Sequence, residues 1–209
     1  MRIQEEYKNT IVIQKSEFIT RLFPVNSIEE VNQKLQEIRK MHYDAKHNCY
    51  AYILGDNQEI QKASDDGEPQ KTAGSPMLEV LKKNNMTNIL AIVTRYFGGI
   101  LLGAGGLIRA YSSSVSSCLK LAKLYDTKLL TKFSLNVSYT SYNTLKKVFS
   151  YINILEESFQ EDVIIVGSID KEKIEDFKKD LYKYKISPET LSILGDFDIL
   201  VPVSSTIDE

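Results

Sequence analysis

The chain has 209 residues, 43% hydrophobic and 26% charged, an ordinary globular composition with room for one large or two small domains. Its net charge of −2 argues against a strongly basic nucleic-acid binder, and it contains no secretory signal pattern or apolar run long enough to span a membrane. Two cysteines, Cys49 and Cys118, are too few for a disulfide framework, so we expect a cytoplasmic protein.

The first elements predicted along the chain are two strands and a helix. Residues 10–14 and 18–25 are rich in Ile, Val, Thr and Phe, which is typical of strands. Ser27, followed three residues later by Glu30, forms a capping-box pattern at the start of a helix with apolar residues at helical spacing.

A hairpin and a first glycine-bearing turn come next. Residues 48–54 and 58–63 predict the hairpin, since a Gly-Asp-Asn turn signal lies between them. Residues 65–76 read DDGEPQKTAGSP and predict a turn that opens a helix. In this helix Ser75 is the expected N-cap, with Pro76 at the first helical position.

A second glycine-bearing turn follows the apolar run 89–93, which we expect to be a strand buried on both faces. Residues 95–111 read RYFGGILLGAGGLIRAY, and five of the ten glycines lie between residues 98 and 106. The helix is expected over residues 104–124. Bare backbone N–H groups at a helix start favour negative charge, so this turn predicts an anion-binding surface.

The element order of residues 1–128 is therefore ββαββαβα, which we expect to form a mixed sheet with its helices on one face. From residue 129 the pattern restarts as βαββαβ, the ferredoxin-like arrangement. The fold class is thus α+β, with domains at residues 1–128 and 129–209. The first domain carries 17 Lys and Arg against 14 Asp and Glu, and the second carries 9 against 14.

Both turns, together with residues 45–52 (AKHNCYAY), carry a resemblance to a known family. On these motifs, which span about a third of the chain, the sequence is identified as a two-domain bacterial member of the IMPACT (YigZ-like) family. Gln70 and Lys71 stand where Ser-Gly is common in the family, Ser75 where Lys or Arg is common, and Leu101 where Lys is common.

The resemblance implies a fold and a biological process for this chain. The first domain resembles the second domain of a small-subunit ribosomal protein, and the second resembles the ferredoxin-like domains of elongation factor G. Eukaryotic relatives modulate the stress-responsive eIF kinase pathway through a partner protein, using an additional N-terminal domain without counterpart in this sequence. What the resemblance implies for this chain is a general link to translation regulation.

The residues of the two turns are the candidate site, but known nucleotide templates do not fit them. The dinucleotide fingerprint lacks its third glycine, and a P-loop would need Lys and Ser or Thr where Ala104 and Gly105 follow Gly103. The glycines either bind an anion or allow tight turns and close helix packing. The predicted anion- or nucleic-acid-binding residues are Lys71, Thr72, Arg95, Gly98, Gly99, Gly103, Gly105, Gly106 and Arg109.

Each candidate side chain has a second interpretation. The two arginines are either an anion clamp or surface charges and internal ion-pair partners of the acidic turn. That turn's carboxylates, Asp65, Asp66 and Glu68, either cap backbone N–H groups or act in acid/base chemistry or magnesium binding. The aromatic residues of the second turn are either stacking surface for bases or core. They are Tyr96, Phe97 and Tyr111.

Metal and thiol chemistry have little support in the sequence. With two His and two Cys in the chain, the group around His42, Asp44, His47 and Cys49 does not make a zinc site, and we expect no metal and no cofactor. A Cys49–His47 nucleophile pair is the alternative to a buried thiol and a hydrogen-bonded imidazole. No two-metal peptidase ligand set is present.

Two hypotheses remain. The first is a non-enzymatic binding protein that contacts RNA, the ribosome or a translation factor through the glycine-rich surface, with a further protein partner at the acidic C-terminal domain and no membrane contact. The second is an enzyme acting on a small phosphorylated or carboxylate substrate, with Asp66 or Glu68 as acid/base. The lack of a complete catalytic set favours the first. An open basic aromatic face would fit the first hypothesis, and a concave pocket where both turns meet would fit the second.

Overall fold

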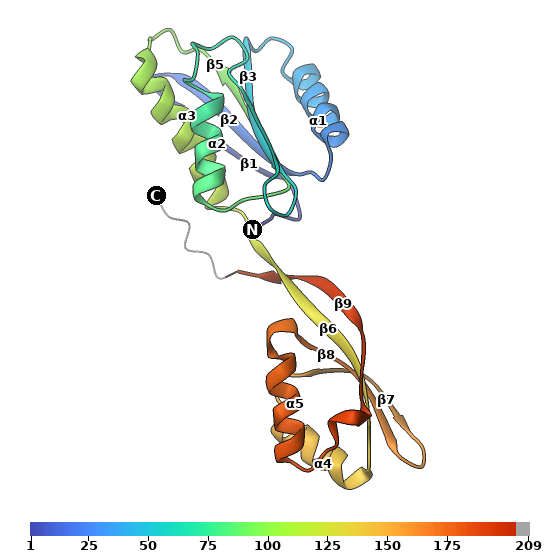
Figure 1. The fold of residues 1–209 in the computed structure, drawn as a ribbon. Helices are drawn as coiled ribbons and strands as arrows, with labels where there is room; N and C mark the ends of the chain where they lie inside the picture. Colours follow the sequence, from blue (N-terminus) through green and yellow to red (C-terminus); the bar gives the residue numbers. More distant parts are fainter. Residues whose placement is uncertain (204–209) are drawn as a thin grey trace. The chain divides into compact units, whose positions relative to one another are not determined.

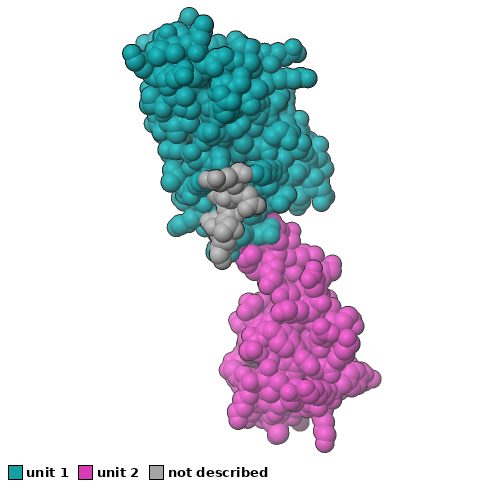
Figure 2. Space-filling model, turned by 90° about the vertical axis from the view of Figure 1, so that its left-hand side faces the viewer, with its two compact units in different colours: residues 1–126, 202–209 teal, residues 127–201 magenta. Residues whose placement is uncertain are grey.

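The computed structural model describes residues 1–203, and it divides the chain into two compact units, each with its own hydrophobic core. Unit 1 holds Met1–Asp126 and the segment from Pro202, and unit 2 holds Thr127–Val201, coloured teal and magenta in Figure 2. The division thus lies two residues before residue 128, and the last strand returns the chain to unit 1.

Unit 1 is built on a five-stranded sheet with the order β1-β2-β5-β3-β4. Every neighbouring pair in it is antiparallel, so the predicted mixed sheet is wrong. The central strand is buried along nearly its whole length, as its apolar run predicts. The strands are β1 (Tyr7–Ile13), β2 (Ser16–Pro24), β3 (His47–Leu54), β4 (Ile60–Ser64) and β5 (Ile89–Tyr96).

The helices of unit 1 cover both faces of this sheet, and the predicted placement on one face is wrong (Figure 1). α1 (Ile28–Met41) packs on one face, and α2 (Gly74–Lys83) with α3 (Gly103–Leu119) packs on the other. Alternating side chains of β5 enter the two cores: Ile92 contacts the α1 side and Val93 the α2–α3 side. A central strand must therefore be apolar at successive positions.

The helix starts show which local signals decide the structure. The capping prediction for α1 is confirmed, since Glu30 donates its N–H to the Ser27 hydroxyl at 3.2 Å. α2 does not begin at Ser75, because the N–H groups of Ala73 and Gly74 donate instead to Asp65 Oδ1, at 3.0 and 2.9 Å. A carboxylate from the preceding turn thus replaces the predicted serine cap.

The end of α3 also differs from the prediction. The helix stops at Leu119 instead of continuing to residue 124. Two short turns follow, in which Leu121 donates to Cys118 and Ala122 to Leu119. They place Ala122 and Leu124 in the core of unit 1, so burial of these side chains ends the helix.

Unit 2 has the predicted βαββαβ order, with the sheet order β7-β8-β6-β9. Both helices pack on the same face, around one core that includes Phe133 and Phe177. No helix in the described chain is long and apolar enough to cross a membrane. The elements are β6 (Tyr125–Val137), α4 (Tyr139–Val148), β7 (Asn153–Phe159), β8 (Val163–Asp170), α5 (Ile174–Lys183) and β9 (Leu191–Pro202), with the 3-10 turns η1 (Lys171–Lys173) and η2 (Pro188–Thr190).

Candidate functional site: the glycine-turn pocket

The two glycine-bearing turns meet at one end of the unit 1 sheet and line an open cavity of about 440 Å³. The turn before α2 and the turn before α3 are brought together because β3 and β5 are paired, with His47 opposite Arg95. We call this cavity the glycine-turn pocket. Its lining residues are Lys46, His47, Gly67, Glu68, Pro69, Arg95, Phe97, Leu101, Leu102, Gly103, Ala104 and Leu107.

A buried ion pair lies at this pocket. Arg95 Nη1 donates to Glu68 Oε1 at 2.7 Å, and the Tyr111 hydroxyl donates to the same oxygen at 2.7 Å. The side chains of Arg95 and Glu68 are only 7% and 3% exposed. Arg95 therefore balances an internal carboxylate, which is the alternative that the sequence left open for it, and Arg95 Nε has no hydrogen-bond partner in the described structure.

Tyr111 and Cys49 extend this network into the core. Tyr111 is fully buried and meets the Phe18 ring edge-on, and burial raises the pKa of Tyr111. Burial also raises the pKa of the Cys49 thiol, to about 12, and this thiol donates to the carbonyl of Asp65 at 2.9 Å. The His47 ring contacts the carbonyl of Asp66 through Nδ1 at 3.0 Å. The structure thus has a buried thiol and a hydrogen-bonded imidazole in place of a nucleophile pair.

The raised thiol pKa values predict a loss of stability in alkali. Burial raises the pKa of both Cys49 and Cys118 from 9.0 to about 12, so above pH 9 the unfolded chain releases protons that the folded chain keeps. The free energy of unfolding is expected to fall above pH 9, by up to about 1.4 kcal/mol per thiol for each pH unit. Urea denaturation at several pH values measures this fall. In the double variant Cys49→Ala/Cys118→Ala, most of this fall in the free energy of unfolding between about pH 8 and 10 should be absent. An equal fall in that variant would contradict the burial argument.

The aspartates of the first turn hold the backbone. Asp65 Oδ2 accepts the N–H of Lys71 at 2.8 Å, in addition to capping α2. Asp66 Oδ2 accepts the N–H of Asn48 at 2.8 Å, and Asp66 Oδ1 pairs with Arg39 at 3.1 Å. The capping interpretation is confirmed for both aspartates. Glu68 differs, because it alone of the three carboxylates lines the pocket.

Four of the five predicted glycines have structural reasons to be glycine. A Cβ on Gly98 would lie 1.9 Å from the carbonyl carbon of Lys15, and one on Gly106 would lie 3.0 Å from a Leu102 carbon. Gly99 and Gly103 have φ values of +86° and +69°, which favour glycine. Gly105 has neither reason, since the nearest atom to its Cβ position is Arg109 Nη1 at 3.7 Å.

The first turn of α3 leaves its backbone N–H groups without a side-chain cap. Leu102 occupies the N-cap position and makes no capping hydrogen bond, and the first turn has no acidic residue. Lys46 stands exposed at the pocket, Arg109 stands exposed beside Gly105, and neither forms an ion pair with a described residue. The partial positive charge of the helix start and two unpaired cations favour an anion here.

The structure brings together only part of the predicted site. Gly103 and Arg95 line the pocket, and Gly106 and Arg109 line a smaller adjoining hollow that shares Leu102. Lys71 is exposed away from the pocket lining, and Thr72 is buried, with its hydroxyl donating to the Pro69 carbonyl at 2.7 Å.

Of the three predicted aromatic residues, the structure likewise places only some at the pocket. Tyr111 belongs to the core, and the Tyr96 hydroxyl donates to Asp44 at 2.9 Å. Phe97 is 54% exposed at the pocket, with the Arg95 guanidinium 5.7 Å from its ring centre. Phe97 is thus the one of the three that offers stacking surface.

The sequence missed Lys46 and His47 as pocket residues. Both stand in the AKHNCYAY segment, but only the pairing of β3 with β5 places them opposite the second turn. Among residues 1–203, no three His, Cys, Asp or Glu side chains are grouped to hold a metal ion.

Comparison with known proteins relates most of the chain to one family. The Impact N-terminal domain family matches residues 14–119. The chain is 51% identical over 138 residues to IMPACT family member YvyE of Bacillus subtilis, an alignment that covers 66% of this chain and 64% of that protein. It is 34% identical over 173 residues to IMPACT family member YigZ of Escherichia coli, covering 81% of this chain and 85% of the relative. A crystal structure described as that of a hypothetical protein aligns with 92% of this chain and 95% of its own, at 32% identity and a TM-score of 0.57.

Proposed function

Because the chain belongs to the IMPACT family, we propose that it is a non-enzymatic binding protein of translational control, and that it contacts RNA, free or within the ribosome, beside the glycine-turn pocket. The family resemblance is the source of the link to translation. The observation that supports RNA contact is the uncapped, acid-free first turn of α3 in unit 1, with Lys46 at the pocket that Gly103 also lines and Arg109 beside exposed Gly105.

The chemistry of this region suits a phosphate chain. The helix start and the two cations offer donors for phosphate oxygens, and Phe97 offers a ring on which a base can stack. The carboxylate at the pocket, Glu68, is already neutralised by Arg95 and does not repel an anion. The proposal includes a cytoplasmic location, which the two free thiols of Cys49 and Cys118 support.

The proposal extends to a second partner. Unit 2, Thr127–Val201, carries 10 Lys and Arg against 12 Asp and Glu, so a second phosphate-binding surface is not expected there. Unit 2 is proposed instead to dock a protein, such as a translation factor.

Binding of RNA and of ribosomes across a salt series tests the proposal. Affinity is expected to fall steeply with salt, and Lys46→Ala and Arg109→Ala should each reduce the salt slope by about one unit. Lys123→Ala is the matched control, because Lys123 is an exposed lysine that follows the far end of α3. Arg95 is unsuitable as a probe, since it is part of the buried ion pair.

Two outcomes would overturn the proposal. One is that the wild-type protein binds neither RNA nor ribosomes at low salt. The other is that Lys123→Ala changes the slope as much as Lys46→Ala and Arg109→Ala, because the contact would then be spread over the whole surface.

An enzyme acting on a small phosphorylated or carboxylate substrate is the second candidate, and the concave pocket of about 440 Å³ where both turns meet is the observation that favours it. The carboxylates that it would use are engaged, Asp66 with Arg39 and the backbone, and Glu68 with Arg95. Saturable binding of a small phosphate or carboxylate compound that is lost in Lys46→Ala, without any RNA binding, would favour this candidate.

A further inference from the structure

The glycine-turn pocket has an apolar wall against which a planar group can lie. Phe97 forms this wall together with Leu102 and Leu107, and the Phe97 ring is 54% exposed. The volume of about 440 Å³ lies within the range of about 300–1,000 Å³ that is typical of small-molecule sites. Exposed aromatic rings at such sites stack on flat heterocycles, so the wall suits a nucleobase.

The first polar group of the lining is a carboxylate oxygen of Glu68. Arg95 and Tyr111 both donate to Oε1 of this side chain. Among residues 1–203, the enclosed side-chain atoms without a partner are four nitrogens, so Oε2, to which no described residue donates, is reached from the pocket. Glu68 Oε2 is therefore a hydrogen-bond acceptor whose position is fixed by the two bonds on Oε1 and whose charge is balanced by Arg95.

The second polar group is the imidazole ring of His47, which also lines the pocket. Its Nδ1 lies 3.0 Å from the carbonyl oxygen of Asp66. A carbonyl oxygen only accepts, so Nδ1 carries the proton of the neutral ring and Nε2 has a lone pair. No described residue donates to Nε2. The pocket thus presents two acceptors, and a ligand that fits them must supply N–H donors.

A flat group with several N–H donors along one edge is a guanine base. Its N1–H and the amino group on C2 donate side by side, whereas adenine and cytosine each place a lone pair beside their amino group. Uracil has a single N–H between two carbonyl oxygens. An arginine side chain of a partner protein also carries such donors, but the exposed Lys46 at the pocket repels a cation.

We propose that the glycine-turn pocket takes a guanine base, and that this base belongs to the RNA of the proposed function, on which the inference rests. The base stacks on Phe97 and donates to Glu68 Oε2 and His47 Nε2, while its phosphate lies toward Lys46 and the start of α3. Phosphate contacts position an RNA chain without reading its sequence. The pocket gives the contact its sequence preference.

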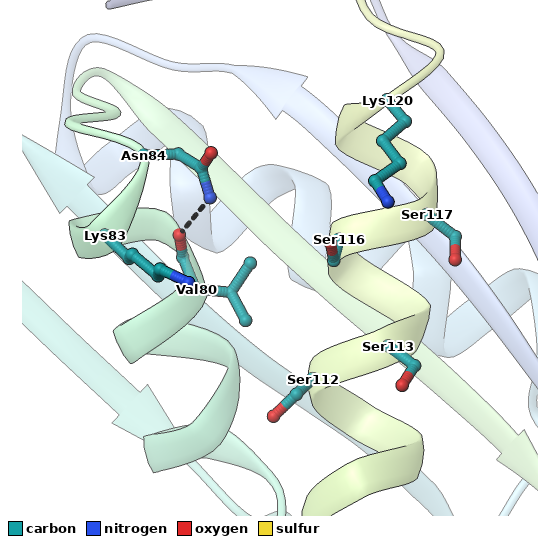
Figure 3. Close-up of a pocket in the computed structure, with 8 residues that line it drawn as sticks. All are labelled: Val80, Lys83, Asn84, Ser112, Ser113, Ser116, Ser117 and Lys120. Atoms are coloured by element: carbon teal, nitrogen blue, oxygen red, sulfur yellow. Dashed lines mark hydrogen bonds between the residues drawn. The ribbon is translucent and has the colours of Figure 1, made fainter. Parts of the chain in front are cut away.

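The hollow between α2 and α3 in Figure 3 provides a contrast. Eight residues line its volume of about 290 Å³, among them Val80, Ser112 and Ser117. None of these eight is a carboxylate or an aromatic residue, and the Asn84 amide is already used in a hydrogen bond to the Val80 carbonyl. This hollow therefore supplies a control position.

Oligonucleotides that differ in one base test the proposal from the side of the ligand. Oligoadenylates of about six nucleotides carry adenine, guanine, hypoxanthine or N1-methylguanine at one central position. Fluorescence anisotropy with the full chain at low salt gives the affinities. The guanine oligonucleotide should bind about tenfold or more tightly than the all-adenine one. Hypoxanthine lacks the amino group and should lose part of this preference, and N1-methylguanine should lose all of it.

Variants test the proposal from the side of the protein. Glu68→Gln should bring the ratio of guanine to adenine affinity close to one, because its amide oxygen replaces Oε1 and its NH₂ group then meets the N–H edge of guanine. Partial unfolding lowers both affinities by the same fraction, so it leaves this ratio unchanged.

Stacking is tested separately. Phe97→Ala should weaken binding of the guanine oligonucleotide by about tenfold. Tyr182→Ala removes an exposed aromatic ring on α5 of unit 2, and Ser117→Ala lies in the hollow of Figure 3, so both should leave the affinity within about twofold.

Equal affinity of the guanine and adenine oligonucleotides, full binding of N1-methylguanine, or an unchanged ratio in Glu68→Gln would overturn the guanine pocket and leave the RNA contact in place. Guanosine monophosphate in the same assay separates the two proposals. If it binds and no oligonucleotide does, the RNA contact is overturned and the pocket is a site for a free guanine nucleotide. Absence of binding by both kinds of ligand would overturn both proposals.

Discussion

Glu68→Gln is expected to lower the free energy of unfolding by roughly 3–5 kcal/mol, because it leaves the Arg95 charge buried without a counter-charge. The substitution keeps the size of the side chain and an oxygen that can accept from Tyr111, so the loss reports the charge alone. Urea denaturation at neutral pH measures it. Tyr111→Phe removes the hydrogen bond to the same carboxylate and a longer contact with the Cys49 thiol, but it leaves the ion pair intact and should cost about 1 kcal/mol.

A second variant separates the ion pair from general damage to the core. Glu68→Gln/Arg95→Met removes both charges, so it should be clearly more stable than Glu68→Gln alone. Equal destabilisation of the single and the double variant would contradict the argument. The same reasoning explains why weaker RNA binding by an Arg95 variant would report folding as much as contact.

Gly98→Ala is expected to lower the free energy of unfolding by about 3 kcal/mol or more, because the new Cβ would lie 1.9 Å from the carbonyl carbon of Lys15. The clash is with backbone, so no side-chain rotation relieves it, and the turn between β1 and β2 must move. Gly98 also donates its N–H to the Ser16 hydroxyl at 3.1 Å, a contact that this movement would break. Urea denaturation measures this loss in the free energy of unfolding.

Gly105→Ala is the matched control, since its Cβ would meet only Arg109 Nη1 at 3.7 Å and its backbone is helical. It should leave stability unchanged or raise it by up to about 1 kcal/mol. Equal loss in the two variants would contradict the account of Gly98. A stable Gly105→Ala protein with weakened RNA binding would indicate that this glycine serves the contact and not the fold.

Local patterns were sufficient for much of the fold. The apolar run of β5 predicted a strand buried on both faces, and the Ser27–Glu30 pair predicted the start of α1. The βαββαβ order of unit 2 followed from the same periodicities. These features depend on residues near one another in the chain, so the sequence contains their physical cause.

Local patterns also predicted much of the candidate site. The glycine cluster marked the start of α3, and backbone capping was one of the two interpretations of the acidic turn, the one that Asp65 and Asp66 confirm. The sequence also gave an internal ion pair as one of two possibilities for Arg95. It did not select between them, because both interpretations require the same residue types.

The sequence by itself therefore determined the elements, their order, the family resemblance and the positions of the two turns. Only the tertiary structure decided that α1 covers the opposite face, that Glu68 is the partner of Arg95, and that Lys46 faces the second turn. Each of these depends on which strands pair and in which register, such as His47 opposite Arg95. Strand pairing joins segments far apart in the chain, and its energy comes from burying many side chains together, so no single stretch of sequence specifies it.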